Sequence, residues 1–376
     1  MKILMWARSD LYDYIGGDRV QIENTANALR VLGVDVDIAT DINIDIETYD
    51  LVHVFQLDWT PETYFYVQKA RKHNKPVILS PIHHSLKEVH RFDNEYVFDY
   101  RRITKYLFRE QHNRDTFKNI YRSLFNIKKA RPTFLSLLIG LAAMHKRTLQ
   151  SANVVLVQTE IEAKDLKETY NVDFEWEKVL NGVSRSFVDV PLVPSPIGVE
   201  NYIISVGRVE PRKNTLKIID AVADFRKKHN LDVKLVLVGK KSRNHIEYLI
   251  RFGFAVRRHS WIVHIEELEN AKMPPLYQHA KVCVSASWFE TTGLTLLEAL
   301  FCGTNAVASG DRAKEYLGAY ASYCDPGSVA SIESAVEKEF FSARPKLPIE
   351  MKKTYTWENT ASKIKGIYMK ELVYAD

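Results

Sequence analysis

Short apolar runs alternate with stretches of helical periodicity along most of the chain, in two series. The first series contains the strand-like runs KILMWA, VDVDIAT, LVHVF, PVILS and NVVLVQT, and the second contains YIISVG, VKLVLVG, WIVHI, KVCVSAS and TNAVAS. Strands that alternate with helices form right-handed βαβ units around a parallel sheet. The pattern predicts an α/β protein with two doubly wound parallel sheets, in two domains that face a cleft.

A proline-rich window separates the two series. Residues 188–200 hold three prolines without helical or strand periodicity, which is typical of an interdomain linker. We therefore expect an N-terminal domain over 1–190 and a C-terminal domain over 191–356, with a last helix over 357–376 that packs back on the first domain. The chain has 376 residues, 46% of them hydrophobic, which suits two globular domains.

The sequence favours a cytoplasmic protein. Its three cysteines are Cys283, Cys302 and Cys324. Because they are odd in number and far apart, neither a disulfide framework nor a zinc site is expected. The apolar run before Arg8 is too short for a signal peptide, and the stretch near 133–144 is too short to span a bilayer.

The basic charge is concentrated in one segment. The chain has a net charge of +5, but residues 101–147 contain twelve Lys/Arg and two Asp/Glu, so this segment contributes +10 and the remainder −5. Aromatic residues lie among these charges, as in a basic amphipathic surface helix. We expect the segment to bind an anionic membrane surface; the alternative is an excursion that packs on its own domain. Nucleic acid is not expected, because no recognition motif accompanies the charge.

Two junctions of the second series carry polar residues where ligands bind in open α/β sheets, beyond the carboxyl ends of strands. Arg208 and Lys213 bracket a turn that opens a helix, which predicts a phosphate or diphosphate site unless both are solvated cations. Further along, Glu290 lies in a strand-end loop and Glu298 lies in the following helix. This spacing would let the two carboxylates bind two hydroxylated groups of one ligand, although Glu298 also suits a helix surface.

The loop between these carboxylates predicts how the helix begins. Thr291 and Thr292 can cap the helix, and Gly293 allows close approach of the backbone.

The first series has two weaker signals. Gly16 and Gly17 follow the first strand, without the GxGxxG fingerprint of a nicotinamide dehydrogenase, and they also suit a simple turn. His83 and His84 follow the strand PVILS, where a histidine could contact a sugar hydroxyl, move a proton or merely pack. Neither histidine has a metal-ligand partner at a suitable spacing.

Together these junctions resemble the GT-B glycosyltransferases of family 4 (glycosyl transferases group 1), which are retaining nucleotide-sugar enzymes with two Rossmann-like domains. The resemblance covers nearly the whole chain. It rests on Gly16-Gly17, NVVLVQTE, VGRVEPRKN, LVLVGK, the E-x7-E block within FETTGLTLLEALFCGTNAVAS, SGDRAKEYLG and Asp325-Pro326-Gly327.

The resemblance implies roles for the donor-side residues. Arg208 and Lys213 would hold the donor diphosphate and offset charge on the leaving group. Glu298 would bind the ribose and Glu290 the donor sugar. The backbone N–H groups of Thr292, Gly293 and Leu294 would face the phosphates or the sugar. The base would lie near 263–265, around His264.

For the acceptor side, the resemblance implies that the loop at Gly16 and Gly17 approaches the donor phosphates and the acceptor, and that His83 or His84 is the acceptor-side histidine. No metal or cofactor is expected. The sequence departs from the family at Thr291-Thr292, where Gly-Phe is usual, and at Asn305, where proline is common, so the donor sugar is left open.

The expected function is transfer of a hexose-type sugar, with retention, from a nucleotide diphosphate sugar to a hydroxyl of a glycan or lipid-linked acceptor. Bacterial surface polysaccharide or glycoconjugate synthesis would suit this reaction, at the inner face of the cytoplasmic membrane. The alternatives are a nucleotide-sugar epimerase of GT-B fold and a non-catalytic, membrane-associated scaffold.

Overall fold

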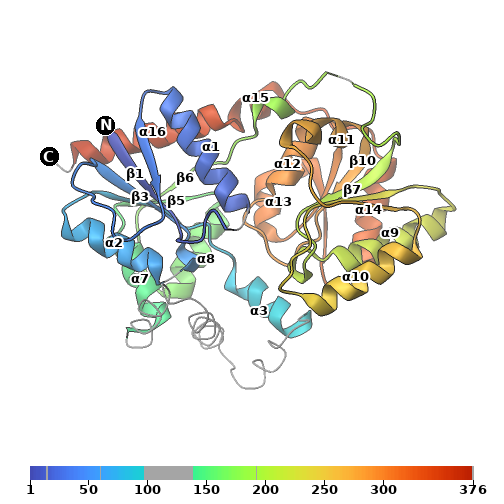
Figure 1. Ribbon diagram of the computed structural model, residues 1–376, viewed down its shortest axis with the longest axis horizontal. Coiled ribbons are helices and arrows are strands. Elements are labelled where there is room, and N and C mark those ends of the chain that lie inside the picture. The colour runs from blue at the N-terminus through green and yellow to red at the C-terminus, as the bar shows by residue number, and fades with distance from the viewer. Residues whose placement is uncertain (14–15, 60, 97–138, 192, 375–376) are drawn as a thin grey trace. The chain divides into compact units, whose positions relative to one another are not determined.

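The computed structural model describes residues 1–13, 16–59, 61–96, 139–191 and 193–374 (Figure 1). These residues form two units. The first comprises the described residues of Met1–Leu86, Tyr106–Gly182 and Thr354–Asp376, and the second those of Lys87–Lys105 and Val183–Lys353. Each unit contains a six-stranded sheet, and all strand pairs in both sheets are parallel.

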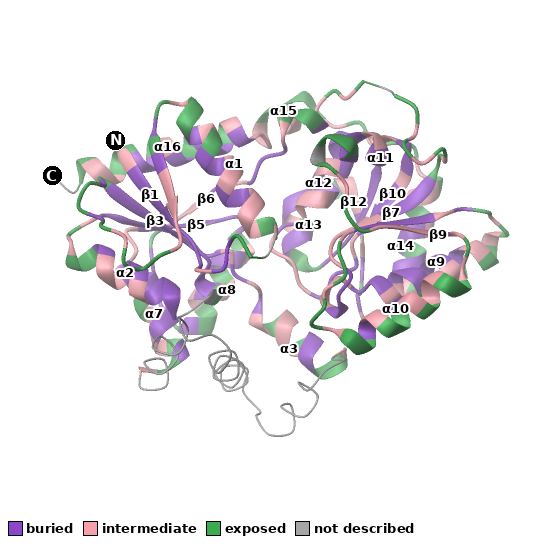
Figure 2. Ribbon diagram, in the orientation of Figure 1, coloured by how far each residue is buried: buried purple, intermediate pink, exposed green. Residues whose placement is uncertain are grey.

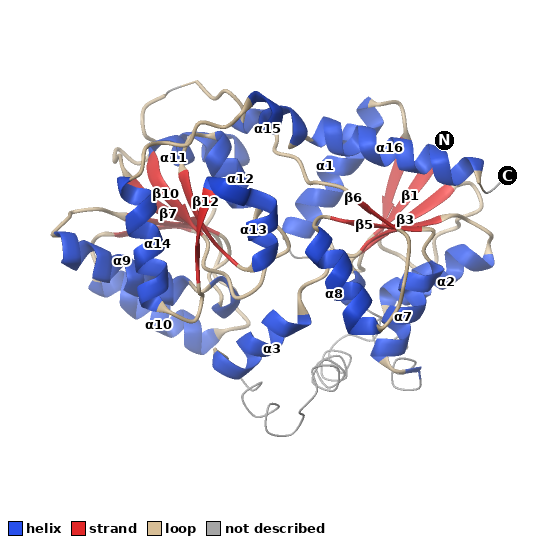
Figure 3. Ribbon diagram, turned by 180° about the vertical axis from the view of Figure 1, so that it is seen from behind, coloured by secondary structure: helices blue, strands red, loops and turns tan. Residues whose placement is uncertain are grey.

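The sheet of the first unit has the order β2-β1-β3-β4-β5-β6. Its strands are β1 (Lys2–Trp6), β2 (Asp35–Ala39), β3 (Leu51–Phe55), β4 (Val77–Ser80), β5 (Val154–Val157) and β6 (Trp176–Lys178). Its helices are α1 (Gly17–Val31), α2 (Glu62–Lys72), α7 (Leu141–Ser151), α8 (Glu160–Tyr170) and α16 (Trp357–Val373), with the 3-10 turn η1 (Leu57–Trp59). Helices α1 and α16 cover one face, and α2, α7 and α8 cover the other (Figure 3).

Alternation along β1 fills two separate cores in this unit. Leu4 and Trp6 pack toward α2, α7 and α8, whereas Ile3 and Met5 pack toward α1 and α16. Successive side chains of a strand point to opposite faces, so a strand buried on both faces reads as a continuous apolar run. This explains the sequence KILMW.

The sheet of the second unit has the order β12-β11-β10-β7-β8-β9. Its strands are β7 (Tyr202–Val206), β8 (Leu235–Val238), β9 (Ile262–Ile265), β10 (Ala280–Val284), β11 (Asn305–Ser309) and β12 (Ala321–Cys324). Its helices are α3 (Leu86–Glu95), α9 (Thr215–His229), α10 (Ile246–Arg258), α11 (Met273–His279), α12 (Leu294–Phe301), α13 (Asp311–Leu317), α14 (Val329–Phe341) and α15 (Ile349–Thr354). Short 3-10 turns are η2 (Arg185–Phe187), η3 (Pro211–Lys213), η4 (Asn270–Lys272) and η5 (Gly318–Tyr320).

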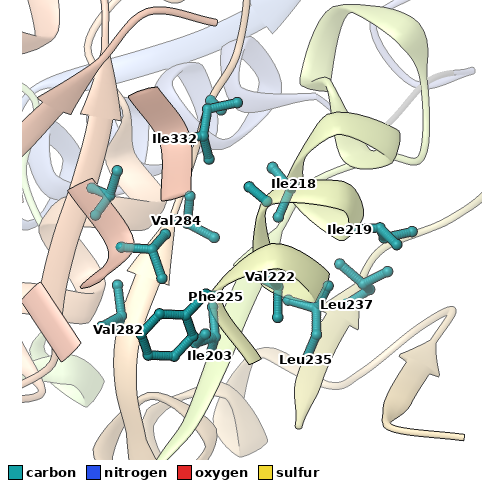
Figure 4. Packing of buried hydrophobic residues seen from close by; sticks show 14 of the residues in the cluster. Ile203, Ile218, Ile219, Val222, Phe225, Leu235, Leu237, Val282, Val284 and Ile332 are labelled. Carbon is teal, nitrogen blue, oxygen red and sulfur yellow. The ribbon is translucent and has the colours of Figure 1, made fainter. Parts of the chain in front are cut away.

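Phe225 of α9 belongs to the hydrophobic core of the second unit. Its ring packs beside Ile203 of β7 and Val282 of β10 (Figure 4).

The α/β class and the two doubly wound sheets predicted from the sequence are confirmed. Differences are local: the edge strands β6 and β12 were not predicted.

The proline-rich window belongs to the second unit rather than linking the two. Gln278 Nε2 donates to Val190 O at 2.7 Å and His279 Nε2 to Val193 O at 2.6 Å. The division between units falls instead after Gly182. A Cβ on Gly182 would collide with the backbone at Trp357, where α16 begins, so a glycine is required where these chain segments cross.

Helix α16 lies against α1 in the first unit. Most of the basic segment 101–147, including all its aromatic residues, lies outside the described residues; only its last part falls on α7. No described helix has both the length and the apolarity that a bilayer span requires.

Candidate active site

The ends of β7 and β8 approach each other closely in the second unit. Gly207 and Gly239 both have positive φ values, of 152° and 146°. A Cβ on Gly239 would overlap the carbonyl of Gly207, and a Cβ on Gly207 would lie 3.3 Å from the side chain of Lys213. Glycine at these positions therefore permits the close approach of the two strand ends. Lys213 lines a small pocket here together with Thr215 and Ser285.

Lys213 Nζ forms an ion pair with Glu290 Oε1. Arg212 lies 3.8 Å from the other carboxylate oxygen. Burial would raise the pKa of Glu290, but Lys213 and Arg212 outweigh it and lower the pKa to about 2. Glu290 is thus an ionised carboxylate in the loop that follows β10, and it pairs with a cation of the turn η3 that follows β7.

Arg208 joins the same cluster through Glu210. Its guanidinium lies 3.6 Å from the buried Glu210 carboxylate, which also pairs with Arg212 at 3.1 Å. Burial would raise the pKa of Glu210, but Arg212, Arg208 and Lys213 lower it. The structure therefore brings the two predicted cations, Arg208 and Lys213, to one site, and adds Arg212, which the sequence analysis did not single out.

Asn214 fastens the loops that carry these groups. Its fully buried side chain donates to Ala286 O at 3.0 Å and to Pro326 O at 2.8 Å. Its backbone is left-handed, with φ of 62°, a conformation that asparagine tolerates better than most residues. No local sequence pattern marks this role, because the partners of Asn214 lie 72 and 112 residues away.

The predicted threonine cap of α12 is wrong. Gly293 occupies the N-cap position with φ of 80°, and no side chain caps the helix. A left-handed backbone at the N-cap favours glycine, because glycine has no Cβ to clash in this conformation. Thr292 is buried, whereas Thr291 and Leu294 are partly exposed. That the N–H groups of this turn face a ligand stays a prediction.

Glu298 differs from Glu290 in its surroundings. The hydroxyl of Tyr277 donates to Glu298 Oε2 at 3.3 Å. Burial raises the pKa of Glu298 to about 7, and the Tyr277 hydrogen bond opposes this shift. Near neutral pH Glu290 is therefore ionised, whereas Glu298 titrates between its protonated and ionised forms.

His264 is engaged within the sheet. Its Nε2 donates to Gly239 O at 3.0 Å, and its ring packs edge-on to Phe252, with centroids 5.1 Å apart. Its side chain thus supports the glycine at the end of β8.

An aromatic cluster supports the Glu290 loop. Phe92 of α3 packs against Trp288 and Phe289, the residues just before Glu290. Lys217 Nζ lies 5.2 Å from the Trp288 ring centroid. The contact of α3 with the second unit was not predicted, because in the sequence this helix follows the strand β4, which belongs to the first unit.

In the first unit, Asp58 binds both predicted histidines. Its Oδ1 pairs with Nδ1 of the buried His83, and its Oδ2 accepts from Nδ1 and the backbone N–H of His84 at 2.9 and 3.0 Å. Burial would raise the pKa of Asp58, but His83 and His84 lower it well below its usual range. The exposed fraction of the His84 side chain is 30%, against 1% for His83, so His84 is the more accessible of the two.

Gly16 and Gly17 begin α1 beside an ion-pair network. A Cβ on Gly16 would collide with the Asp18 carboxylate, and Arg8 Nε donates to Asp18 Oδ2 at 2.8 Å. Arg8 also pairs with Asp10. Two carboxylates around one buried arginine leave this edge without the excess of positive charge found in the second unit.

A His/Glu cluster among the described residues has metal-ligand geometry, but it lies elsewhere. His229, Glu333 and Glu337 hold potential ligand atoms within 4.8 Å of one another. Lys228 Nζ already bonds to both carboxylates, at 3.2 and 2.5 Å. His229 ends α9, whose other end carries Thr215, about 20 Å away.

The chain is similar to a known protein family and to two curated proteins. Residues 195–340 match the model of the family described as glycosyl transferases group 1. O-antigen chain mannosyltransferase B of Escherichia coli is 26% identical over 45% of this chain and 46% of its own length. Alpha-monoglucosyldiacylglycerol synthase of Streptococcus pneumoniae is 26% identical over 43% of this chain and 38% of its own. The match thus spans less than half the length of either curated relative.

Solved structures resemble the fold over its whole length. Sucrose-phosphate synthase of Thermosynechococcus elongatus has a TM-score of 0.69 at 15% identity, covering 100% of both chains. The HepE protein of Anabaena, in complex with UDP, has a TM-score of 0.68 at 13% identity, covering 98% of this chain and 100% of its own. These likenesses extend over both units, whereas the family match lies within the second. The chain therefore has the GT-B fold, and its residues 195–340 match the family model of the glycosyl transferases group 1.

Proposed function

We propose that the protein is a retaining glycosyltransferase that moves a hexose-type sugar from a nucleotide diphosphate sugar to a hydroxyl acceptor. The observation that carries the proposal is the cluster in which Lys213 and Arg212 pair with the ionised Glu290 and Arg208 pairs with Glu210, within the region that matches the family. Three cations against the two carboxylates Glu210 and Glu290 leave an excess of positive charge for a diphosphate.

The Lys213–Glu290 pair suggests how the donor is held. A diphosphate that enters the site competes for Lys213 and stabilises the ammonium in place of the carboxylate. Glu290 is then released as an acceptor for the hydroxyls of the donor sugar. As the glycosidic bond breaks, negative charge grows on the diphosphate, and Lys213 and Arg208 stabilise it. The acceptor hydroxyl attacks from the same face and passes its proton to the departing diphosphate oxygen, so the anomeric configuration is retained.

Glu298 and His84 complete the proposed roles. Glu298 binds the ribose hydroxyls, and the backbone of 263–265 lies near the base. His84 is oriented by two hydrogen bonds to Asp58, and it contacts the acceptor hydroxyl. The reaction needs no metal or cofactor, because the cations of the site neutralise the leaving diphosphate.

The relatives suggest the substrate classes. HepE has been solved with UDP-glucose, and the two curated relatives are an O-antigen chain mannosyltransferase and a glucosyldiacylglycerol synthase. A glycan or a lipid-linked sugar is therefore the proposed acceptor, in bacterial surface polysaccharide or glycoconjugate synthesis at the inner face of the cytoplasmic membrane, where the segment 101–147 would bind anionic lipid.

A donor screen followed by product analysis tests this function. Nucleotide diphosphate sugars are first ranked by thermal shift, and transfer to glycan and lipid-linked acceptors is then followed with and without EDTA. We expect nucleotide release that depends on the acceptor, resists EDTA and yields a product with the donor's anomeric configuration by NMR. Sugar inversion without an acceptor would indicate the epimerase, and no thermal shift with any donor would indicate the scaffold.

A further inference from the structure

Helix α10 exposes a stripe of large apolar side chains. The exposed fractions are 71% for Ile246, 53% for Ile250 and 61% for Phe254. Residues at i, i+4 and i+8 fall within an arc of about 80° and extend about 12 Å along a helix. The opposite side of α10 is buried: Tyr248 and Phe252 pack into the core of the second unit. In Figure 2 the ribbon of α10 carries both buried and exposed colours along its length.

Positive charge accompanies this stripe. Four arginines lie on the exposed side of α10 and just before it: Arg243, Arg251, Arg257 and Arg258. Glu247 is the one acidic residue between 243 and 258, and it pairs with Arg251 at 3.0 Å, so the stretch carries a net charge of +3. The guanidinium of Arg257 lies 5.0 Å from the ring centroid of Phe254. Apolar and cationic groups thus share one surface.

A second apolar pair shows that exposure alone does not create this pattern. Met369 and Val373 of α16 have exposed fractions of 56% and 74%. Their neighbours Lys370 and Glu371 carry one charge of each sign. This pair has no excess of positive charge, and it serves as the matched control.

We propose that α10 is an interfacial helix that docks the second unit on an anionic lipid surface. Ile246, Ile250 and Phe254 enter the boundary between headgroups and acyl chains, and the arginines contact the anionic headgroups. A helix whose apolar face is flanked by arginines gains affinity from both the buried apolar area and the negative surface charge. The inference does not depend on the transfer reaction, and it concerns residues other than those of the segment 101–147.

Vesicle co-sedimentation tests the proposal. The triple variant Ile246→Ser/Ile250→Ser/Phe254→Ser should bind vesicles of equal parts phosphatidylcholine and phosphatidylglycerol at least about tenfold more weakly than the wild-type protein. Met369→Ser/Val373→Ser should bind like the wild type. Because all five side chains are exposed, both variants should keep the wild-type melting temperature. Equal binding by the triple variant and the wild type would overturn the proposal.

A label on the helix separates α10 from every other lipid-binding surface. The three native cysteines are buried, so Phe254→Cys can be labelled selectively with an environment-sensitive dye, and Met369→Cys serves as the control. We expect a blue shift on adding anionic vesicles for the dye at position 254 alone. An unshifted dye at 254 on a vesicle-bound protein would overturn the proposal. So would a wild-type dimer in ultracentrifugation that the triple variant dissolves, because a second copy would then cover this face.

Discussion

The carboxyl-end edges of the two sheets arrange charge in opposite ways. In the second unit, three cations surround the two carboxylates Glu210 and Glu290. In the first unit, Arg8 is held by Asp10 and Asp18, and Asp58 is shared by two histidines. The second edge therefore suits an anion, and the first suits a neutral, hydroxylated ligand. This difference supports our proposal that the diphosphate donor binds the second unit and the acceptor binds the first.

Removal of Lys213 should give the largest effect. In Lys213→Ala the site loses the cation between β7 and Glu290, so transfer should fall by about 10²- to 10³-fold. Lys227→Ala, which removes an exposed lysine of α9, is the matched control and should leave the rate unchanged. The measurement is steady-state transfer with the donor selected by thermal shift. A rate for Lys213→Ala close to that of the control would remove the diphosphate assignment.

A substitution at Asp58 should give a smaller loss of a different kind. Asp58→Asn weakens the hold on His84, and transfer should fall by about tenfold to a hundredfold. Donor affinity should not change, because Asp58 belongs to the first unit. Parallel titrations of donor and acceptor separate the two effects, with the exposed Asp35→Asn as control. Weakened donor binding in Asp58→Asn would break the division of roles between the sheets.

Glu298 should make donor binding depend on pH. Its pKa of about 7 lies above the ordinary value of 4.5, so the carboxyl is protonated below about pH 7. If the ribose hydroxyls bind the carboxylate, affinity should rise by up to about tenfold per pH unit as the pH approaches 7 from below, and then level off. Glu298→Gln should flatten this profile.

The probe for this titration is a nucleotide diphosphate sugar, whose phosphates do not titrate near neutral pH. The raised pKa also means that the folded protein binds this proton more tightly than the unfolded chain. The stability that Glu298 contributes in the ligand-free protein should therefore fall as the pH rises from about 4.5 to 7. A wild-type affinity profile as flat as that of Glu298→Gln would contradict the ribose role.

The sequence predicted the charged residues at the carboxyl-end edge of the second sheet better than those of the first sheet, for a physical reason. Arg208 and Lys213 lie on one strand-to-helix junction, so local spacing alone places them together. Asp58 is 25 residues from His83, and Asn214 is 112 residues from Pro326. Such partners meet only through the tertiary fold, and no local pattern marks them.

The domain boundary illustrates the same limit. Three prolines indicated a linker at 188–200, but hydrogen bonds from Gln278 and His279 hold that segment on the second unit. The boundary between the two units falls after Gly182. At that point the backbone of Trp357, a residue near the other end of the chain, lies close to Gly182. Helix α3 likewise follows a strand of the first unit and packs on the second through Phe92, a contact that only the folded chain reveals.

Calorimetric titration of three proteins with the selected donor tests the central claim most directly. We expect Asp58→Asn to bind the nucleotide diphosphate sugar as tightly as the wild type, and Lys213→Ala to bind it at least about tenfold more weakly. Wild-type affinity in Lys213→Ala would contradict the assignment of the donor diphosphate to the second unit.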